Sequence, residues 1–163
     1  MKKITCFVSV LALTFAVSLS SCKKSADTTP AATTTLYDRL GKVDNIRKVV
    51  DTFINNVVAD NVINGKFSST VSSTDKDAQG NNLRVRALKI NLVDQVCAAT
   101  GGPCTYNGLT MQQAHKGMGI TEAQFNALVG DLSKALDANG AAAADRDALL
   151  GALAPMKTDI VNQ

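Results

Sequence analysis

The sequence predicts an all-α protein built as a single domain. Its 163 residues are the length of one ordinary domain, and 45% of them are hydrophobic, which is enough to form a buried core. Only 4% are aromatic, none is tryptophan, and proline is rare after residue 30. This composition favours alanine-, leucine- and valine-rich helices over a β-sandwich or barrel. Apolar residues spaced three and four apart in several stretches also indicate helices.

The N-terminal segment is expected to lie outside that domain. Lys2 and Lys3 precede an apolar run over residues 4–19, which is shorter than the about 20 residues of a membrane-spanning helix and typical of a signal peptide. The sequence Leu19-Ser20-Ser21-Cys22 resembles a bacterial lipobox, in which Cys22 would carry lipid; the alternative is an ordinary secretory signal. We therefore expect an exported protein, anchored by lipid to a bacterial membrane on its extracytoplasmic side. The expected division is a signal peptide over 1–21, a flexible tether over 22–34 and a folded domain over 35–163.

The cysteines divide between these parts. Cys6 lies in the signal peptide and Cys22 in the lipobox, which leaves Cys97 and Cys104 in the folded domain. Outside the reducing cytosol these two residues either form a disulfide or remain separate thiols.

The charge balance gives no reason to expect nucleic-acid binding. The chain has 17 Lys and Arg against 14 Asp and Glu, and removal of residues 1–21 takes away two lysines and no acid, leaving 15 against 14. A nearly neutral chain without a basic cluster lacks the electrostatic surface that nucleic acids require.

The first helices of the domain follow from local signals. Thr35 is placed to cap a short helix over 36–40, which Gly41 ends. From Val43 to about Asp60 the apolar residues form one wide helical face. Residues 68–82 are rich in Ser, Thr, Asp, Asn and Gly and predict an exposed loop after a turn at Asn64-Gly65.

Three more helices are predicted in the second half. Asn82 is placed to cap a helix that reaches Thr100 and stops at Gly101-Gly102-Pro103. Thr121 opens a helix through a capping box with Gln124, and Asn139-Gly140 closes it. The last helix is expected over about 144–161, with a kink at Pro155.

Any imidazole chemistry must use His115, because it is the only histidine. A lone histidine is most often a surface or hydrogen-bonded structural residue. The sequence has no Cys-x-x-Cys-His motif, no second histidine and no Gly-x-Ser-x-Gly motif. Covalent c-type haem attachment, a histidine-rich zinc site and a hydrolase nucleophile elbow are therefore excluded.

Around His115 the sequence resembles the group I truncated haemoglobins. The Gly-Gly-Pro at 101–103, the following Tyr106-x-Gly108 and the His-x-Gly-x-Gly-Ile-Thr at 115–121 match the motifs of that family. The Leu-Tyr-Asp-Arg-Leu-Gly at 36–41 matches its start, although Lys42 stands where the family usually has a second glycine. The resemblance implies a two-over-two helical sandwich around haem b, with residues 43–60 paired with 83–100 and residues 122–139 paired with 144–161.

The resemblance also implies a role for particular residues. His115 would be the proximal ligand of the haem iron, and Ile54, Leu88 and Leu92 would form a distal wall without a hydroxyl, amide or imidazole donor. Because the chain has no second histidine, the opposite position on the iron would be open. The remaining cofactor-binding residues would be Phe53, Phe67, Tyr106 and Met111.

By the same resemblance, the protein would bind oxygen, nitric oxide and carbon monoxide reversibly. Turnover of nitric oxide or peroxide, with an unidentified reductase as electron donor, is a further expectation, although gas binding is favoured over a dedicated enzyme. Two alternatives stay open. One is a helical module that holds an apolar ligand or partner without haem, and the other is an electron-transfer or redox haem protein, which a Cys97–Cys104 pair would suit.

Overall fold

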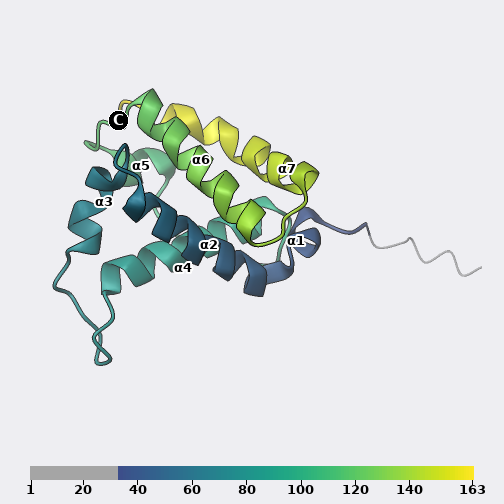
Figure 1. The fold of residues 1–163 in the computed structure, drawn as a ribbon, viewed down its shortest axis with the longest axis horizontal. Coiled ribbons are helices and arrows are strands. Elements are labelled where there is room, and N and C mark those ends of the chain that lie inside the picture. The colour runs from purple at the N-terminus through teal and green to yellow at the C-terminus, as the bar shows by residue number, and fades with distance from the viewer. Residues whose placement is uncertain (1–32) are drawn as a thin grey trace, which may run out of the picture. The chain divides into compact units, whose positions relative to one another are not determined.

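A computed structural model describes residues Thr33–Gln163 of the chain. The predicted signal peptide, Cys22 and most of the tether lie outside the described residues. Between Thr33 and Gln163 the chain is helical and contains no strand, as predicted (Figure 1). None of these helices is both long enough and apolar enough to span a membrane. The elements are α1 Leu36–Arg39, α2 Lys42–Ala59, α3 Asn64–Val71, α4 Leu83–Ala99, α5 Met111–His115, α6 Glu122–Ala138, α7 Ala143–Leu153 and the 3-10 helix η1 Ala154–Asp159.

Side-chain caps begin several of the helices, as the sequence predicts. The hydroxyl of Thr35 accepts from the backbone N–H of Asp38. The side chain of Asn82 accepts from the first N–H groups of α4. Thr121 and Gln124 form the predicted capping box at the start of α6. Such caps satisfy N–H groups that have no partner within the helix, so they fix where each helix starts.

Helix α2 is the centre of the fold, because it packs against both α4 and α6. In Figure 1, α2 and α4 run in opposite directions in one layer, and α6 and α7 do the same in the other. The predicted helix pairs are therefore present. The buried face of α2 consists of Ile46, Val49, Val50, Phe53, Ile54 and Val57.

The predicted exposed loop over 68–82 is wrong for its first residues. Helix α3 continues to Val71, and Asn64-Gly65 is its first turn rather than a separate turn. Phe67 packs against the core, and the hydroxyls of Ser68 and Ser72 donate to carbonyls one turn back. The polar helix is held to the fold through the partly buried Phe67 ring, while its serine hydroxyls are satisfied by its own backbone.

The rest of that segment is a folded loop. The carboxylate of Asp77 accepts from the backbone N–H groups of Gln79 and Asn81. Hydrogen bonds from the side-chain amide of Asn81 to the same carboxylate are the main reason that the pKa of Asp77 is lowered.

The C-terminal helix also differs from the prediction. Helix α7 ends at Leu153 and the chain tightens into η1, so Pro155 terminates the α-helix instead of kinking it. Proline has no N–H to bond to the carbonyl four residues back, which favours the tighter turn. Beyond η1, Asn162 donates to the carbonyl of Ile120 and Gly119 donates to the carbonyl of Gln163. The C-terminus is thus fastened to the segment that follows His115.

Candidate functional site around His115

His115 is the last residue of the short helix α5. Thr110 and Gln113 form a capping box that starts this helix, which the sequence analysis did not foresee. The Nδ1 atom of His115 lies 2.7 Å from the carbonyl oxygen of Met111. Since a carbonyl can only accept, Nδ1 is the donor, and in the neutral imidazole Nε2 then carries the lone pair. This is the tautomer that a histidine needs to bind a metal through Nε2.

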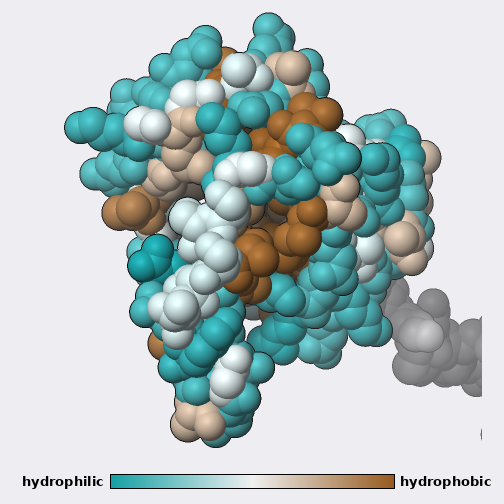
Figure 2. Space-filling view, turned by 60° about the vertical axis from the view of Figure 1, so that its left-hand side comes forward, coloured by the Kyte–Doolittle hydropathy of each residue, from teal (hydrophilic) through white to brown (hydrophobic). Residues whose placement is uncertain are grey.

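The half-buried His115 side chain lines a cavity of about 360 Å³, here called the histidine cavity. Figure 2 shows a hollow with an apolar interior on the face of the molecule that carries α3. The cavity wall comes mainly from α2, α3, α4, α5 and α6. Of the residues predicted to bind a cofactor, those that line it with His115 are Phe53, Phe67, Leu88, Leu92, Tyr106 and Met111.

A second cavity, of about 450 Å³, continues from the histidine cavity towards α6 and α7. His115, Phe53 and Leu92 line both cavities, while Leu132 and Leu150 line only the second. Volumes of 300 to 1,000 Å³ with a mostly apolar lining are usual for cofactor sites. The apolar space beside His115 is therefore large enough for a cofactor.

The cavity wall differs from the predicted one at two residues. Ile54 is buried in the core beside Phe53 but lines neither cavity. Gln95, which the sequence analysis missed, lines both, and its Nε2 lies 3.3 Å from the sulfur atoms of Met111 and of Met156. A thioether is a weak acceptor, so this amide donor has no strong partner. Gln95 follows Leu92 by three residues, a spacing that could have placed it on the cavity-facing side of α4.

The Tyr106-x-Gly108 motif has a steric explanation. The hydroxyl of Tyr106 donates to the carbonyl of Leu109 at 2.7 Å, so its ring folds back over the chain. A Cβ atom at Gly108 would lie 2.4 Å from the Tyr106 ring, closer than atoms can approach. Glycine at 108 therefore allows Tyr106 to close one side of the histidine cavity.

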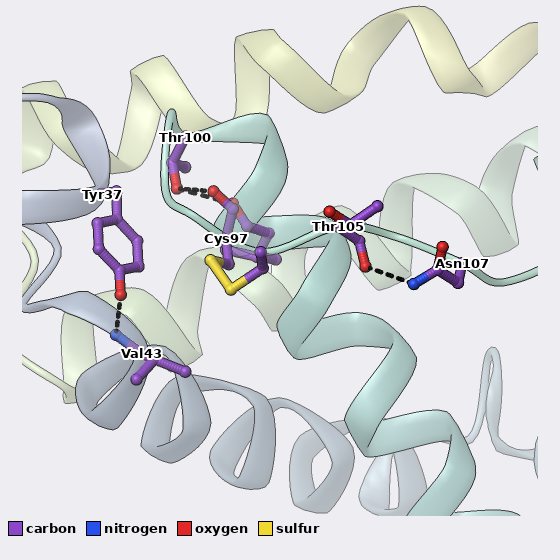
Figure 3. The surroundings of a disulfide bond; sticks show 8 residues. Tyr37, Val43, Cys97, Thr100, Thr105 and Asn107 are labelled. Carbon is purple, nitrogen blue, oxygen red and sulfur yellow. Dashed lines mark hydrogen bonds between the residues drawn. A yellow bond between two sulfur atoms is a disulfide. The ribbon is translucent and has the colours of Figure 1, made fainter.

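A disulfide joins Cys97, at the end of α4, to Cys104, in the loop that leads to α5 (Figure 3). The Cys97 side chain is fully buried. Between the two cysteines, a Cβ atom at Gly102 would lie 2.7 Å from the Cys97 sulfur and 2.6 Å from the ring of Tyr37. Residue 102 of the Gly-Gly-Pro sequence therefore has to be glycine, because the chain passes directly over the disulfide there.

We expect the intact mass of the purified protein to rise by two hydrogens on reduction, as the Cys97–Cys104 bond opens. The closed loop is short, so on the chain-entropy model the loss of the bond should lower the free energy of unfolding by at most about 2.5 kcal/mol. Mass spectrometry with and without reductant measures the first effect, and urea unfolding measures the second. The control is a Cys97→Ser/Cys104→Ser double variant, and treatment with reductant should leave its mass unchanged. An unchanged mass in the unsubstituted protein would mean free thiols.

The family described as bacterial-like globin matches residues 35–162, which is most of the chain. The chain belongs to the bacterial-like globin family. A group 1 truncated haemoglobin of Mycolicibacterium paratuberculosis, GlbN, is 34% identical over 125 residues, which cover 77% of this globin and 82% of that protein. A group 1 truncated haemoglobin GlbN of Nostoc is 29% identical over 129 residues, which cover 79% of this globin and 98% of that protein.

Solved structures agree on the fold. The truncated haemoglobin of Tetrahymena pyriformis in its Fe(III) form superposes with a TM-score of 0.68 at 24% identity, over 79% of this globin and 99% of that chain. The predicted two-over-two helical sandwich of the truncated globins is therefore confirmed. Membership of the family implies haem iron as the cofactor and diatomic gases as ligands.

Proposed function

We propose that this globin binds haem b with His115 as the proximal ligand and takes oxygen, nitric oxide or carbon monoxide on the opposite side. The observation that carries the proposal is the hydrogen bond between His115 Nδ1 and the Met111 carbonyl, which leaves Nε2 as a lone-pair donor beside an apolar cavity. When bound, haem would supply an iron that binds the His115 imidazole and a small gas.

The residues present fit such a group. Phe53 and Phe67 give the cavity aromatic surface suited to a flat macrocycle, and no carboxylate lines it. Among residues 33–163, no three His, Cys, Asp or Glu side chains lie close enough together to hold a bare metal ion. His115 is the only imidazole in the sequence, so the chain cannot supply a second one to the same iron.

Titration of the purified cofactor-free protein with hemin tests this proposal. We expect a Soret band that saturates at one hemin per chain and shifts when the reduced complex takes up carbon monoxide. No Soret change on titration would contradict haem binding and favour a helical module that holds some other apolar ligand.

We further propose that the protein is exported and anchored by lipid on Cys22. The support is the sequence alone, in which the Leu19-Ser20-Ser21-Cys22 motif follows a charged start and a short apolar run. One acyl chain binds membranes only marginally, and stable anchoring needs more than one, as lipoproteins carry. The lipid would hold the globin domain at the outer side of the membrane through the tether.

Cys22→Ser is expected to move the protein from the membrane fraction to the soluble fraction, because it removes the lipid-bearing thiol. Cell fractionation followed by immunoblotting measures the change. Cys6→Ser is a matched control, because Cys6 lies within the predicted signal peptide and cannot carry the lipid. This variant should leave the partition between membrane and soluble fractions unaltered. If Cys22→Ser stays in the membrane fraction, the lipobox assignment is wrong.

A further inference from the structure

The histidine cavity has an uneven charge distribution. Its wall includes two cationic side chains, Lys66 from α3 and Arg84 from the first turn of α4, and no Asp or Glu. The rest of the lining is apolar or neutral. A cavity with this lining suits a ligand that is apolar over most of its surface and carries negative charge.

Lys66 is held at the cavity by neutral partners. Its Nζ donates to the carbonyls of Met118 at 2.6 Å and Gly119 at 3.3 Å, in the segment just after His115. An ammonium group has three donors, so one remains. No carboxylate among residues 33–163 forms an ion pair with Lys66. Its positive charge is therefore placed beside the cavity without a negative partner in the described part of the chain.

Arg84 has a similar spare capacity. Its Nε pairs with Asp75 at 3.1 Å, and both side chains are more than half exposed. Within residues 33–163 its two terminal nitrogens make no hydrogen bond. A guanidinium presents these groups as a planar fork that matches a carboxylate.

We infer that Lys66 and Arg84 bind the two propionate carboxylates of the haem, one each. This rests on the proposed function, because haem is the apolar ligand with two carboxylates at one edge. The Met118 and Gly119 carbonyls keep the Lys66 ammonium in place before the cofactor arrives. The two cations orient the cofactor, with its charged edge at α3 and the start of α4 and its apolar part towards Leu92 and Leu128.

A comparison of hemin with hemin dimethyl ester, whose carboxylates are methylated, tests the inference. Lys66→Met and Arg84→Gln should each raise the Kd for hemin about tenfold or more, since each removes a charge-assisted hydrogen bond. Neither should change the Kd for the dimethyl ester. Soret titration gives both constants. Lys66→Arg should restore hemin binding, and the matched controls Lys48→Met and Arg86→Gln, which do not line the cavity, should bind both cofactors normally.

The outcomes separate the two proposals. If Lys66→Met and Arg84→Gln weaken hemin and its ester equally, or leave hemin binding unchanged, the carboxylate assignment is wrong although haem still binds. If the unsubstituted protein binds neither cofactor, the proposed function fails and this inference fails with it.

Discussion

His115→Ala is expected to abolish stoichiometric haem retention while leaving the helical content nearly unchanged. The substitution removes the only imidazole of the chain, so no other side chain can supply the same iron ligand. The His115 side chain is only half buried, so little packing is lost. The residue is the last of a short helix, which begins at the Thr110–Gln113 capping box. Soret absorbance after gel filtration measures retention, and far-UV circular dichroism measures helicity.

A matched control and a rescue sharpen this test. Gln112→Ala changes an exposed side chain of the same helix and should retain haem normally. His115→Gly opens space where the imidazole stood, so free imidazole in solution should restore part of the haem spectrum. A His115→Ala protein that keeps a five-coordinate histidine-haem spectrum would show that the proximal ligand has been misassigned.

Much of the fold could be predicted because its signals are local. The caps at Thr35, Asn82 and Thr121 and the apolar faces of α2 and α6 lie within a few residues of the structure they determine. Helix α3 could not be predicted in this way. Its serines are weak helix formers, and its contact with the core comes through the partly buried Phe67, which packs against distant residues.

The residues of the site that could be predicted also depend on local sequence. His115 and its neighbours were found because the motif around them is contiguous in the sequence. Lys66 was missed because its partner Met118 lies 52 residues away, whereas Gln95 was missed although its three-residue spacing from Leu92 could have placed it on the same side of α4. No local periodicity records the contact between Lys66 and Met118, so this cation on the cavity wall is found only when the chain is folded.

We expect the native protein to release oxygen rapidly and Ile54→Tyr to slow that release. The resemblance to truncated haemoglobins aligns Ile54 with the usual distal tyrosine of that family, and Leu88 and Leu92 offer no donor either. Ile54 itself lines neither cavity, so the longer tyrosine side chain has to reach the histidine cavity from the core. Oxygen held by haem is more polar than carbon monoxide, so it gains more from a hydrogen bond. A hydrogen bond to a charged acceptor is worth roughly 1.5 to 3 kcal/mol, and every 1.4 kcal/mol is about tenfold. Oxygen dissociation should therefore slow by about ten- to a hundredfold, and carbon monoxide dissociation should change little.

Two further variants decide which group provides the donor. Ile54→Phe adds a ring of similar size without the hydroxyl, so it separates a steric effect at this 6% exposed position from a hydrogen bond. Gln95→Leu removes the amide that the structure places on the cavity wall with only thioether partners. Stopped-flow measurements give the dissociation rates of both gases for all three variants. If Ile54→Phe matches Ile54→Tyr, or if both gases slow equally, the tyrosine acts by bulk alone. If native oxygen release is slow and Gln95→Leu accelerates it, Gln95 is the donor, and the distal wall is polar because of a residue one helical turn beyond Leu92.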